Sequence, residues 1–172
     1  VSRPITSSYP GIESVTPPDK LTPLSIKSPV VWYCINICPN ARNRIKKGMI
    51  NNLNLSTNVQ LLGSEDRIES LLPNYDIYCN LSDGEAFGLS LIEAMACGLP
   101  AIVYDIPPFD SLIPPHAAKK VKNKSQTMLK EYLIDLADKN ERERIGKNGR
   151  NYVRENYSVE KMASNYYNLF IG

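Results

Sequence analysis

Short apolar runs alternate with amphipathic stretches along the central part of the chain. Residues 30–35 form a continuous run rich in β-branched and aromatic side chains, which is typical of a strand buried on both faces. Apolar side chains at helical spacing follow over residues 40–52, and a second apolar run occupies residues 59–62. This order of strand, helix and strand predicts a β-α-β unit.

The same alternation continues along the next part of the sequence. A short helix is expected at 65–72, a strand at 76–81, a helix at 89–97 and a strand at 100–104. Strands that alternate with helices favour a parallel sheet with helices on both faces. The pattern therefore predicts an α/β fold built on a parallel sheet.

Beyond the strands the pattern becomes helical. Ser125 is a candidate N-cap for a helix at 126–138, and Asn140 with Glu143 resembles a capping box that begins the next helix. Ser158 is a candidate N-cap for the terminal helix. The C-terminal part of the chain is therefore expected to consist of consecutive helices.

The two ends of the chain differ from this central pattern. Residues 1–29 hold many of the 13 prolines among Ser, Thr and Gly, and we interpret them as an extended leader or linker. Residues 30–172 are then one domain, which is long enough to bury a continuous core. The terminal helix carries an apolar stripe that we interpret as a packing face. Its members are Met162, Tyr166 and Leu169 or Phe170.

The charge of the chain is nearly balanced. Its 20 Lys and Arg against 18 Asp and Glu give a net charge of +2, which predicts no electrostatic grip on nucleic acid. The longest basic cluster is interpreted as a solvated edge, with weak attraction to acidic lipid as the alternative. It comprises Lys119, Lys120, Lys122 and Lys124. No stretch approaches the roughly 20 apolar residues of a transmembrane helix, and no secretory signal pattern opens the chain. We expect a cytoplasmic protein, either free or peripheral to the membrane.

Two residue types that often form metal or catalytic sites give only weak signals here. The four cysteines lie in or beside apolar segments, and a single Cys-x3-Cys pair is a weak zinc signal, so buried free thiols are expected. They are Cys34, Cys38, Cys79 and Cys97. The single histidine, His116, follows two prolines in an expected loop and is interpreted as structural or exposed.

The segment 82–100 joins an expected buried strand to an expected buried helix and carries the candidate chemistry. Ligands of open parallel sheets bind beyond the carboxyl ends of the strands. Gly88 lies near the helix start, where a missing side chain lets a phosphate approach backbone N–H groups at the positive end of the helix dipole. This turn is therefore a candidate phosphate site.

Two glutamates flank that candidate phosphate site in sequence. Glu93 lies about one turn into a mostly apolar helix, where an unpaired carboxylate is costly, and helical side chains lean toward the N-terminus. We therefore expect Glu93 to point back toward the phosphate position and to accept hydrogen bonds from two neighbouring sugar hydroxyls. Glu85 precedes the helix and is expected on the other side of the phosphate. The two predict a nucleotide diphosphate sugar site; the alternative is an exposed Glu85 and a Glu93 that caps local backbone amides.

The motif E-A-F-G-L-S-L-I-E-A-M-A-C-G-L-P at 85–100 closely resembles the E-x-F-G-x4-E-A-M-A-x-G-x-P signature of the retaining glycosyltransferase family 4. A looser resemblance extends over residues 30–170. It implies a GT-B fold, in which the C-terminal domain is a Rossmann-like parallel sheet with helices on both faces and binds the sugar donor.

The resemblance also implies roles for individual residues. The residue matching Glu93 holds the nucleotide ribose, and the residue matching Glu85 contacts the donor sugar, which makes Glu85 the candidate catalytic residue. Backbone amides at Phe87, Gly88 and Leu89 meet the sugar or the diphosphate. The implied donor is a UDP- or GDP-linked sugar, and the implied acceptor is a saccharide, a lipid or a protein. The implied reaction retains anomeric configuration, needs no metal or cofactor, and relies on electrostatic stabilisation of the departing diphosphate.

The sequence departs from the family pattern in two respects. Family members have an N-terminal acceptor domain of comparable size, which we expect to be supplied by a partner subunit or a longer parent. They also begin the donor domain with a Gly-Arg pair and a Lys that neutralise the diphosphate, and residues 1–29 hold no such segment. Asp105 and Asp110 follow the strand at 100–104 and are further site candidates.

Two other functions remain open from the sequence. A non-catalytic glycosyltransferase-like binding or scaffolding subunit fits the missing cationic elements. A nicotinamide-dependent dehydrogenase half fits the alternating architecture, but the first strand is not followed by a G-x-G-x-x-G turn. Retention of Glu85, Phe87, Gly88 and Glu93 favours the donor-binding domain.

Overall fold

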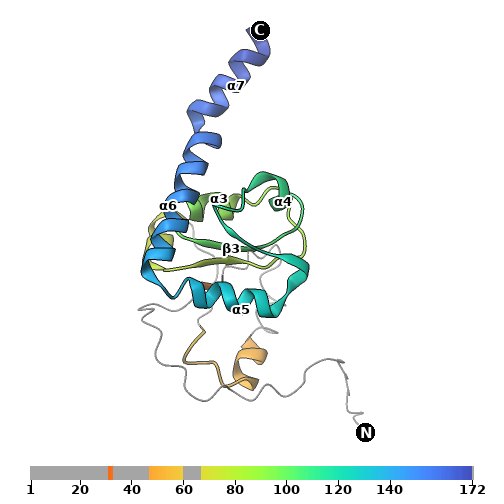
Figure 1. Ribbon diagram of the computed structural model, residues 1–172, viewed down its shortest axis with the longest axis vertical. Helices are drawn as coiled ribbons and strands as arrows, with labels where there is room; N and C mark the ends of the chain where they lie inside the picture. The colour runs from red at the N-terminus through yellow and green to blue at the C-terminus, as the bar shows by residue number, and fades with distance from the viewer. Residues whose placement is uncertain (1–30, 33–46, 60–66, 172) are drawn as a thin grey trace.

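The computed structural model describes residues 31–32, 47–59 and 67–171, and its centre is a four-stranded parallel sheet (Figure 1). The strands follow one another across the sheet in chain order. They are β1 (Val31–Trp32), β2 (Tyr78–Asn80), β3 (Ala101–Tyr104) and β4 (Lys119–Val121). The predicted parallel sheet is confirmed, and every described strand presents its carboxyl end at the same edge.

Short helices connect the strands and longer ones follow the last strand. Before β2 lie α2 (Ile68–Leu71) and the 3-10 turn η1 (Leu72–Asn74); α3 (Leu89–Ala96) joins β2 to β3, and α4 (Phe109–Leu112) joins β3 to β4. After β4 come the 3-10 turn η2 (Lys122–Lys124), α5 (Gln126–Asp135), α6 (Lys139–Asn156) and α7 (Val159–Ile171). A further helical stretch covers 47–52. The expected helices at 65–72 and 89–97 are therefore present.

Helices cover both faces of the sheet, as predicted. Alternate strand residues point to opposite faces, so Ala101 and Val103 belong to the core cluster that includes α3. Ile102, between them, belongs to a second cluster with Leu136 after α5 and Ile145 of α6. All five side chains are buried. The two clusters give β3 an apolar environment on each face, which explains its continuous apolar sequence.

The long helix α6 packs directly against the end of α3. A Cβ atom on Gly146 would collide with the carbonyl oxygen of Gly98, so only glycine permits this approach. Gly98 itself has φ +83 and ends the α3 turn in the left-handed conformation. The two glycines allow α6 to lie close to the helix that carries the candidate site.

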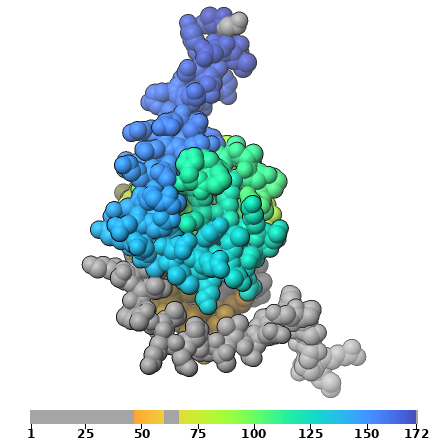
Figure 2. All heavy atoms as spheres, in the orientation of Figure 1, coloured from red at the N-terminus to blue at the C-terminus, as the bar shows by residue number. Residues whose placement is uncertain are grey.

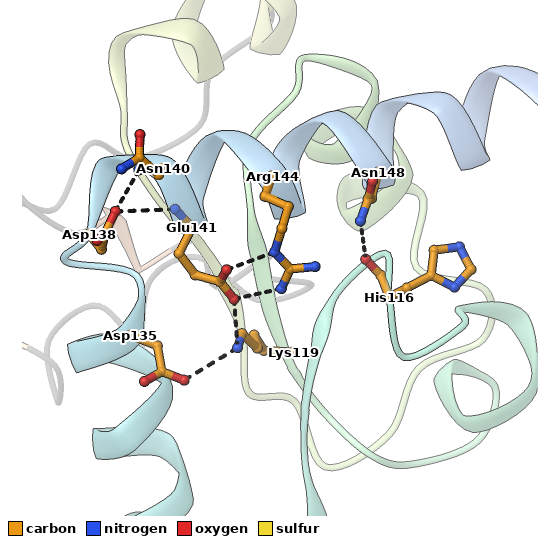
Figure 3. A network of polar contacts seen from close by, with 8 residues as sticks. All are labelled: His116, Lys119, Asp135, Asp138, Asn140, Glu141, Arg144 and Asn148. Carbon is orange, nitrogen blue, oxygen red and sulfur yellow. Dashed lines mark hydrogen bonds and ion pairs between the residues drawn. The ribbon is translucent and has the colours of Figure 1, made fainter.

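An ion-pair network fastens the start of α6 to β4 and α5 (Figure 3). The Nζ of Lys119 lies 3.0 Å from a carboxylate oxygen of Glu141 and 3.3 Å from one of Asp135. Arg144 donates two hydrogen bonds of 2.8 Å to the same Glu141 carboxylate. Farther along α6, the side-chain amide of Asn148 donates to the backbone carbonyl of His116. These contacts fix α6 relative to the sheet edge.

The interpretation of the lysine cluster as a solvated edge is wrong for its first half. Lys119 and Lys120 belong to strand β4, and their side chains are only 16% and 10% exposed. Opposite charges allow this burial, because Lys119 contacts two carboxylates and Lys120 lies 3.8 Å from Asp105. Strand β4 was not predicted, since consecutive lysines conceal the apolar pattern of a strand.

Helix starts were predicted with mixed success. Ser125 and Ser158 are confirmed as caps, because their hydroxyl oxygens accept hydrogen bonds from the backbone N–H groups of Met128 and Lys161. The proposed capping box of Asn140 and Glu143 is wrong. Asp138 caps α6 instead, with its carboxylate accepting from the N–H of Asn140 at 2.6 Å and from that of Glu141. Consequently α5 ends at Asp135, before the predicted end at 138.

The expected packing partner of the α7 stripe is not found among the described residues. Every residue of α7 is exposed, and the helix projects beyond the body formed by the sheet and the other helices (Figures 1 and 2). Exposed fractions in the stripe are 54% for Met162, 57% for Tyr166, 75% for Leu169 and 80% for Phe170. The stripe is therefore an uncovered apolar surface in this structure.

Several expectations concern parts of the chain outside the described residues. The leader at 1–29 lies wholly there, as do Cys34 and Cys38. The strand expected at 30–35 is described only at Val31–Trp32, where β1 pairs with β2 as predicted. Of the strand expected at 59–62, only Val59 is described, and it is not in a strand.

Candidate functional site

The candidate site lies at the carboxyl ends of β2 and β3. Asn80 is the last residue of β2, and the loop at 81–88 leads from it to the first turn of α3. After β3, residues 105–108 lead to α4, whose buried Phe109 packs beside Gly88. The parallel topology places both loops at one edge of the sheet, where ligands of open α/β folds bind.

Gly88 shapes the start of α3. It is the N-cap residue, has φ +86 in the left-handed region, and provides no capping side chain. A Cβ atom at this position would collide with the ring of Phe109, so glycine is required both by conformation and by space. The first N–H groups of α3 therefore lack the usual side-chain acceptor, which makes them suitable donors for an anion.

Glu85 is held in the loop by the side chain of Asn80. The Nδ2 of Asn80 donates a 3.1 Å hydrogen bond to Glu85 Oε1, and its Oδ1 accepts one of 3.1 Å from the backbone N–H of Ser82. Asn80 is buried at 4% exposure, whereas Glu85 is partly exposed. The carboxylate of Glu85 is thus anchored at one oxygen and reaches the surface of the site.

Glu93 is exposed, so the expected apolar surroundings of this carboxylate are wrong. Helix α3 packs on the core through Leu91, Ala94 and Met95, and Glu93 lies on the opposite side. Leu89 precedes it by one turn and is 67% exposed. The two side chains therefore share the outer face of α3, and Glu93 needs no buried partner to be stable.

Phe87 begins a row of aromatic rings that links the site to the end of α6. Its ring, which is 39% exposed, lies 5.8 Å from that of Tyr157 in an edge-to-face arrangement. Tyr157 in turn lies 5.9 Å from Tyr152, whose ring is 6.4 Å from His116. The hydroxyls of both tyrosines donate to the carbonyl of Leu112. Burial is the main cause that raises the pKa of Tyr157 to about 12, so this hydroxyl stays protonated.

The two aspartates that follow β3 are engaged within the protein. The carboxylate of Asp105 lies 3.8 Å from the Nζ of Lys120, and the carboxylate of Asp110 accepts a 2.7 Å hydrogen bond from the N–H of Ser111. Lys120 also donates to the carbonyl of Asp110. These contacts fasten the loop after β3 to β4, and they account for both aspartates without a ligand.

A second lysine beyond β4 reaches across to the loop that carries Glu85. The Nζ of Lys124 lies 2.6 Å from the carboxylate of Asp83, and both side chains are largely exposed. Sequence reasoning missed this pair because the two residues are far apart in the chain. It also missed Asn80 and Tyr157, whose contacts with Glu85 and Phe87 depend on tertiary packing.

The remaining titratable groups supply no second candidate site. Cys79 is a buried free thiol, as predicted, and burial raises its pKa to about 12. Within 31–32, 47–59 and 67–171, no group of His, Cys, Asp and Glu is arranged to hold a metal ion. A shallow depression of about 250 Å³ lies at the amino ends of the strands, away from the candidate site. It is lined by Pro73, Tyr75, Asp76, Cys97, Gly98, Leu99, Pro100, Arg142 and Glu143.

Comparison with known families supports the reading of the motif. Residues 40–152, more than half of the chain, match the family model "Glycosyl transferases group 1". The chain belongs to this family. Among the helices that the structure describes, none is long and apolar enough to cross a membrane.

Curated relatives of this glycosyl transferase domain include two bacterial enzymes that match most of it. It is 31% identical over 124 residues to N-acetyl-alpha-D-glucosaminyl L-malate synthase of Bacillus anthracis, covering 71% of this chain and 32% of the relative. It is 27% identical over 134 residues to poly(ribitol-phosphate) alpha-N-acetylglucosaminyltransferase of Staphylococcus aureus, covering 76% and 27%. The domain therefore spans about a third of the length of these relatives.

Solved glycosyltransferases share the fold. Sucrose-phosphate synthase from Thermosynechococcus elongatus matches with a TM-score of 0.66 and 28% identity, over 76% of this chain and 35% of that one. TarM matches with a TM-score of 0.66 and 26% identity, over 77% and 27%. The GT-B neighbours confirm the predicted fold class: this chain has the parallel sheet and flanking helices of one domain of a GT-B glycosyltransferase.

Proposed function

We propose that this chain is the donor-binding domain of a retaining, metal-independent glycosyltransferase and that it binds a UDP-linked sugar. The observation that carries the proposal is the glycine-capped start of α3, with Glu85 in the loop before it and Glu93 on its exposed face. A helix N-terminus without a capping side chain suits a diphosphate, and carboxylates on either side of it suit the hydroxyls of a ribose and a sugar.

In the proposed complex each part of the site has one task. The backbone amides at Phe87, Gly88 and Leu89 contact the diphosphate or the sugar, Glu93 accepts hydrogen bonds from the ribose hydroxyls, and Glu85 accepts them from the donor sugar. As the bond between the anomeric carbon and the diphosphate breaks, negative charge grows on the leaving oxygen. The positive end of the α3 dipole would stabilise that charge, and Lys124 is a nearby cation that the sequence motif does not supply.

The names of the relatives narrow the donor to be tested first. Two curated relatives are named as N-acetylglucosaminyl enzymes, and a third is the UDP-N-acetylglucosamine--peptide N-acetylglucosaminyltransferase GtfA subunit of Streptococcus parasanguinis, 39% identical over 49 residues. TarM was solved with UDP and alpha-GlcNAc-glycerol. These names support UDP-N-acetylglucosamine as the donor, within the wider UDP- or GDP-linked class.

Transfer of the sugar is proposed to require a second, acceptor-binding domain. The relatives are about three times longer than the matched region, and a GT-B reaction takes place in a cleft between two domains. Orienting two substrates and excluding water contribute several kcal/mol to such reactions. The uncovered stripe of α7, which comprises Met162, Tyr166, Leu169 and Phe170, is the proposed docking surface for that domain.

Calorimetric titration of the purified chain tests the donor site directly. We expect weak binding of UDP-N-acetylglucosamine, with a dissociation constant of about 0.1 to 1 mM, because the family's cationic diphosphate contacts are not matched in the sequence. GDP-mannose serves as the matched donor with another base and sugar. Absence of heat with every UDP- and GDP-linked sugar at millimolar concentration would contradict the proposal and favour a non-catalytic scaffolding subunit.

A transfer assay tests the need for a second domain. The purified chain is incubated with UDP-N-acetylglucosamine and saccharide or lipid acceptors, with and without added cell extract. We expect no transfer by the chain alone, although slow donor hydrolysis is compatible with an open site. Efficient transfer by the purified chain would refute the requirement for an acceptor domain while supporting the donor site.

A further inference from the structure

The side chain of Asn80 is a buried polar group whose position calls for an explanation. It ends β2, an inner strand of the described sheet, and its neighbours Tyr78 and Cys79 are apolar core residues. At 4% exposure, an amide in this place must find hydrogen-bond partners or destabilise the fold. A valine or leucine would occupy the end of a buried strand without that requirement.

Both functional groups of the Asn80 amide are committed, and in a fixed sense. The Oδ1 accepts the backbone N–H of Ser82 at 3.1 Å, which only the carbonyl side of the amide can do. The Nδ2 must therefore face Glu85, and it lies 3.1 Å from Oε1 of that carboxylate. The orientation of the amide follows from the backbone donor and does not depend on the glutamate.

Among residues of this size, asparagine alone satisfies both contacts. Aspartate would accept the Ser82 N–H equally well, but it would place a second carboxylate against Glu85. Leucine, which has similar volume, would satisfy neither group. The combination of acceptor and donor in one short side chain explains why an amide occupies this position.

We propose that Asn80 is a positioning residue that aims the Glu85 carboxylate at the donor sugar; this inference rests on the proposed function. The hydrogen bond occupies Oε1 and leaves Oε2 to accept from a sugar hydroxyl. It also removes the rotational freedom of a glutamate that would otherwise move in a loop, so little entropy is lost when the sugar binds.

Two other contacts support this role by holding the loop on either side of Glu85. The Lys124–Asp83 ion pair fastens the outer part of the loop to η2, and the Gly88–Phe109 contact fixes its end against α4. Neither contact touches the carboxylate itself. Among the printed contacts of Glu85, the bond from Asn80 is the one that sets the direction of its side chain.

The test compares binding of UDP-N-acetylglucosamine and of UDP to variants of the full chain. In Asn80→Asp the acceptor for Ser82 remains and the donor to Glu85 is lost. We expect affinity for the nucleotide sugar to fall roughly tenfold, toward that of UDP, while affinity for UDP stays unchanged. Equal losses for both ligands, or no loss for either, would overturn the proposal but leave donor binding standing.

Two further variants separate positioning from folding. Tyr78→Phe removes the buried hydrogen bond between its hydroxyl and Ser90, in the same strand, and should lower stability without changing the preference for nucleotide sugar over UDP. The double variant Asn80→Asp with Glu85→Gln reverses donor and acceptor, so it should recover the stability lost in Asn80→Asp without recovering sugar binding. Recovery of sugar binding would overturn the proposal, because it would show that the hydrogen bond, and not an aimed carboxylate, is what matters.

An NMR measurement without ligand keeps this inference separate from the donor proposal. The side-chain NH2 signals of Asn80 should shift and exchange faster with water in Glu85→Ala than in the unchanged chain. No shift would overturn the positioning role whatever the ligand results. If the signals shift but no nucleotide sugar binds, the hydrogen bond exists and the proposed function itself is wrong, together with the role that depends on it.

Discussion

The ring of Phe109 fills the space in which a Cβ atom of Gly88 would lie. The two residues belong to different loops at the carboxyl edge of the sheet, one before α3 and the other at the start of α4. Their contact sets the close approach of these loops and leaves the start of α3 without a side chain. One packing relationship therefore shapes both the core and the candidate diphosphate position.

Replacing Gly88 by alanine should destabilise the fold. The substitution adds strain in the left-handed region, about 1–2 kcal/mol, and overpacking against Phe109, about 1–3 kcal/mol, so a loss of about 2–4 kcal/mol is expected in urea denaturation. Gly84→Ala is the matched control, because Gly84 is exposed and has no atom within 4 Å of its Cβ position. A Gly88→Ala variant as stable as the control would show that the loop moves aside freely.

The two glutamates should contribute differently to ligand binding. Glu93→Gln is expected to weaken UDP and UDP-N-acetylglucosamine alike, because both contain the ribose, whereas Glu85→Gln should weaken only the sugar conjugate. Loss of a charge-assisted hydrogen bond costs about 1.5–3 kcal/mol, or roughly ten- to a hundredfold in affinity. Calorimetry measures both, with the exposed Glu131→Gln of α5 as control. If both variants lose affinity for UDP equally, the division of roles is incorrect.

The Glu141 network should make stability depend on pH in the acid range. Arg144, and then Lys119, hold the pKa of Glu141 at about 2, below its ordinary value of 4.5. Because the folded-state pKa is the lower one, the stabilisation is fully present above about pH 5 and is lost as the pH falls toward 2. Glu141→Gln should therefore lower stability by about 1 kcal/mol at pH 7, and its difference from the unchanged chain should shrink between pH 5 and pH 2.

The control for this network lies on the same helix. Glu143 pairs with Lys139 at 3.4 Å, but both side chains are mostly exposed, so Glu143→Gln should have little effect at either pH. Urea denaturation of the three proteins at several pH values makes the comparison. A Glu141→Gln difference that stays constant down to pH 2 would exclude the carboxylate charge as its source.

The tyrosines at the end of α6 should act together. The hydroxyls of Tyr152 and Tyr157 donate to the same carbonyl of Leu112, at 2.6 and 3.1 Å. Each single Tyr→Phe substitution should cost about 1 kcal/mol, and the double should cost more than the sum, since the partly buried carbonyl then loses both side-chain donors. Thermal or urea denaturation measures this, with the exposed Tyr167→Phe of α7 as control. Strict additivity would mean that the two bonds are independent.

The sequence by itself determined the architecture and the place of the candidate site. Alternating apolar runs predicted the parallel sheet and helices on both faces, because a strand buried on each face must be apolar throughout, as 101–103 are. The motif around Gly88 located the strand-to-helix turn, since only glycine suits its left-handed conformation. Local caps such as Ser125 were also predictable, because the capping contact spans three residues.

Only the tertiary structure decided which side chains are buried and which partners they have. Strand β4 was hidden because Lys119 and Lys120 are neutralised by Glu141, Asp135 and Asp105, which lie elsewhere in the chain. Glu93 was expected among apolar groups, yet the direction in which α3 faces the core leaves it exposed. The apolar stripe of α7 likewise looked like a packing face, but whether an apolar face is covered depends on what lies beside it. Contacts between distant residues set burial and charge pairing, and a pattern read along one chain holds no record of them.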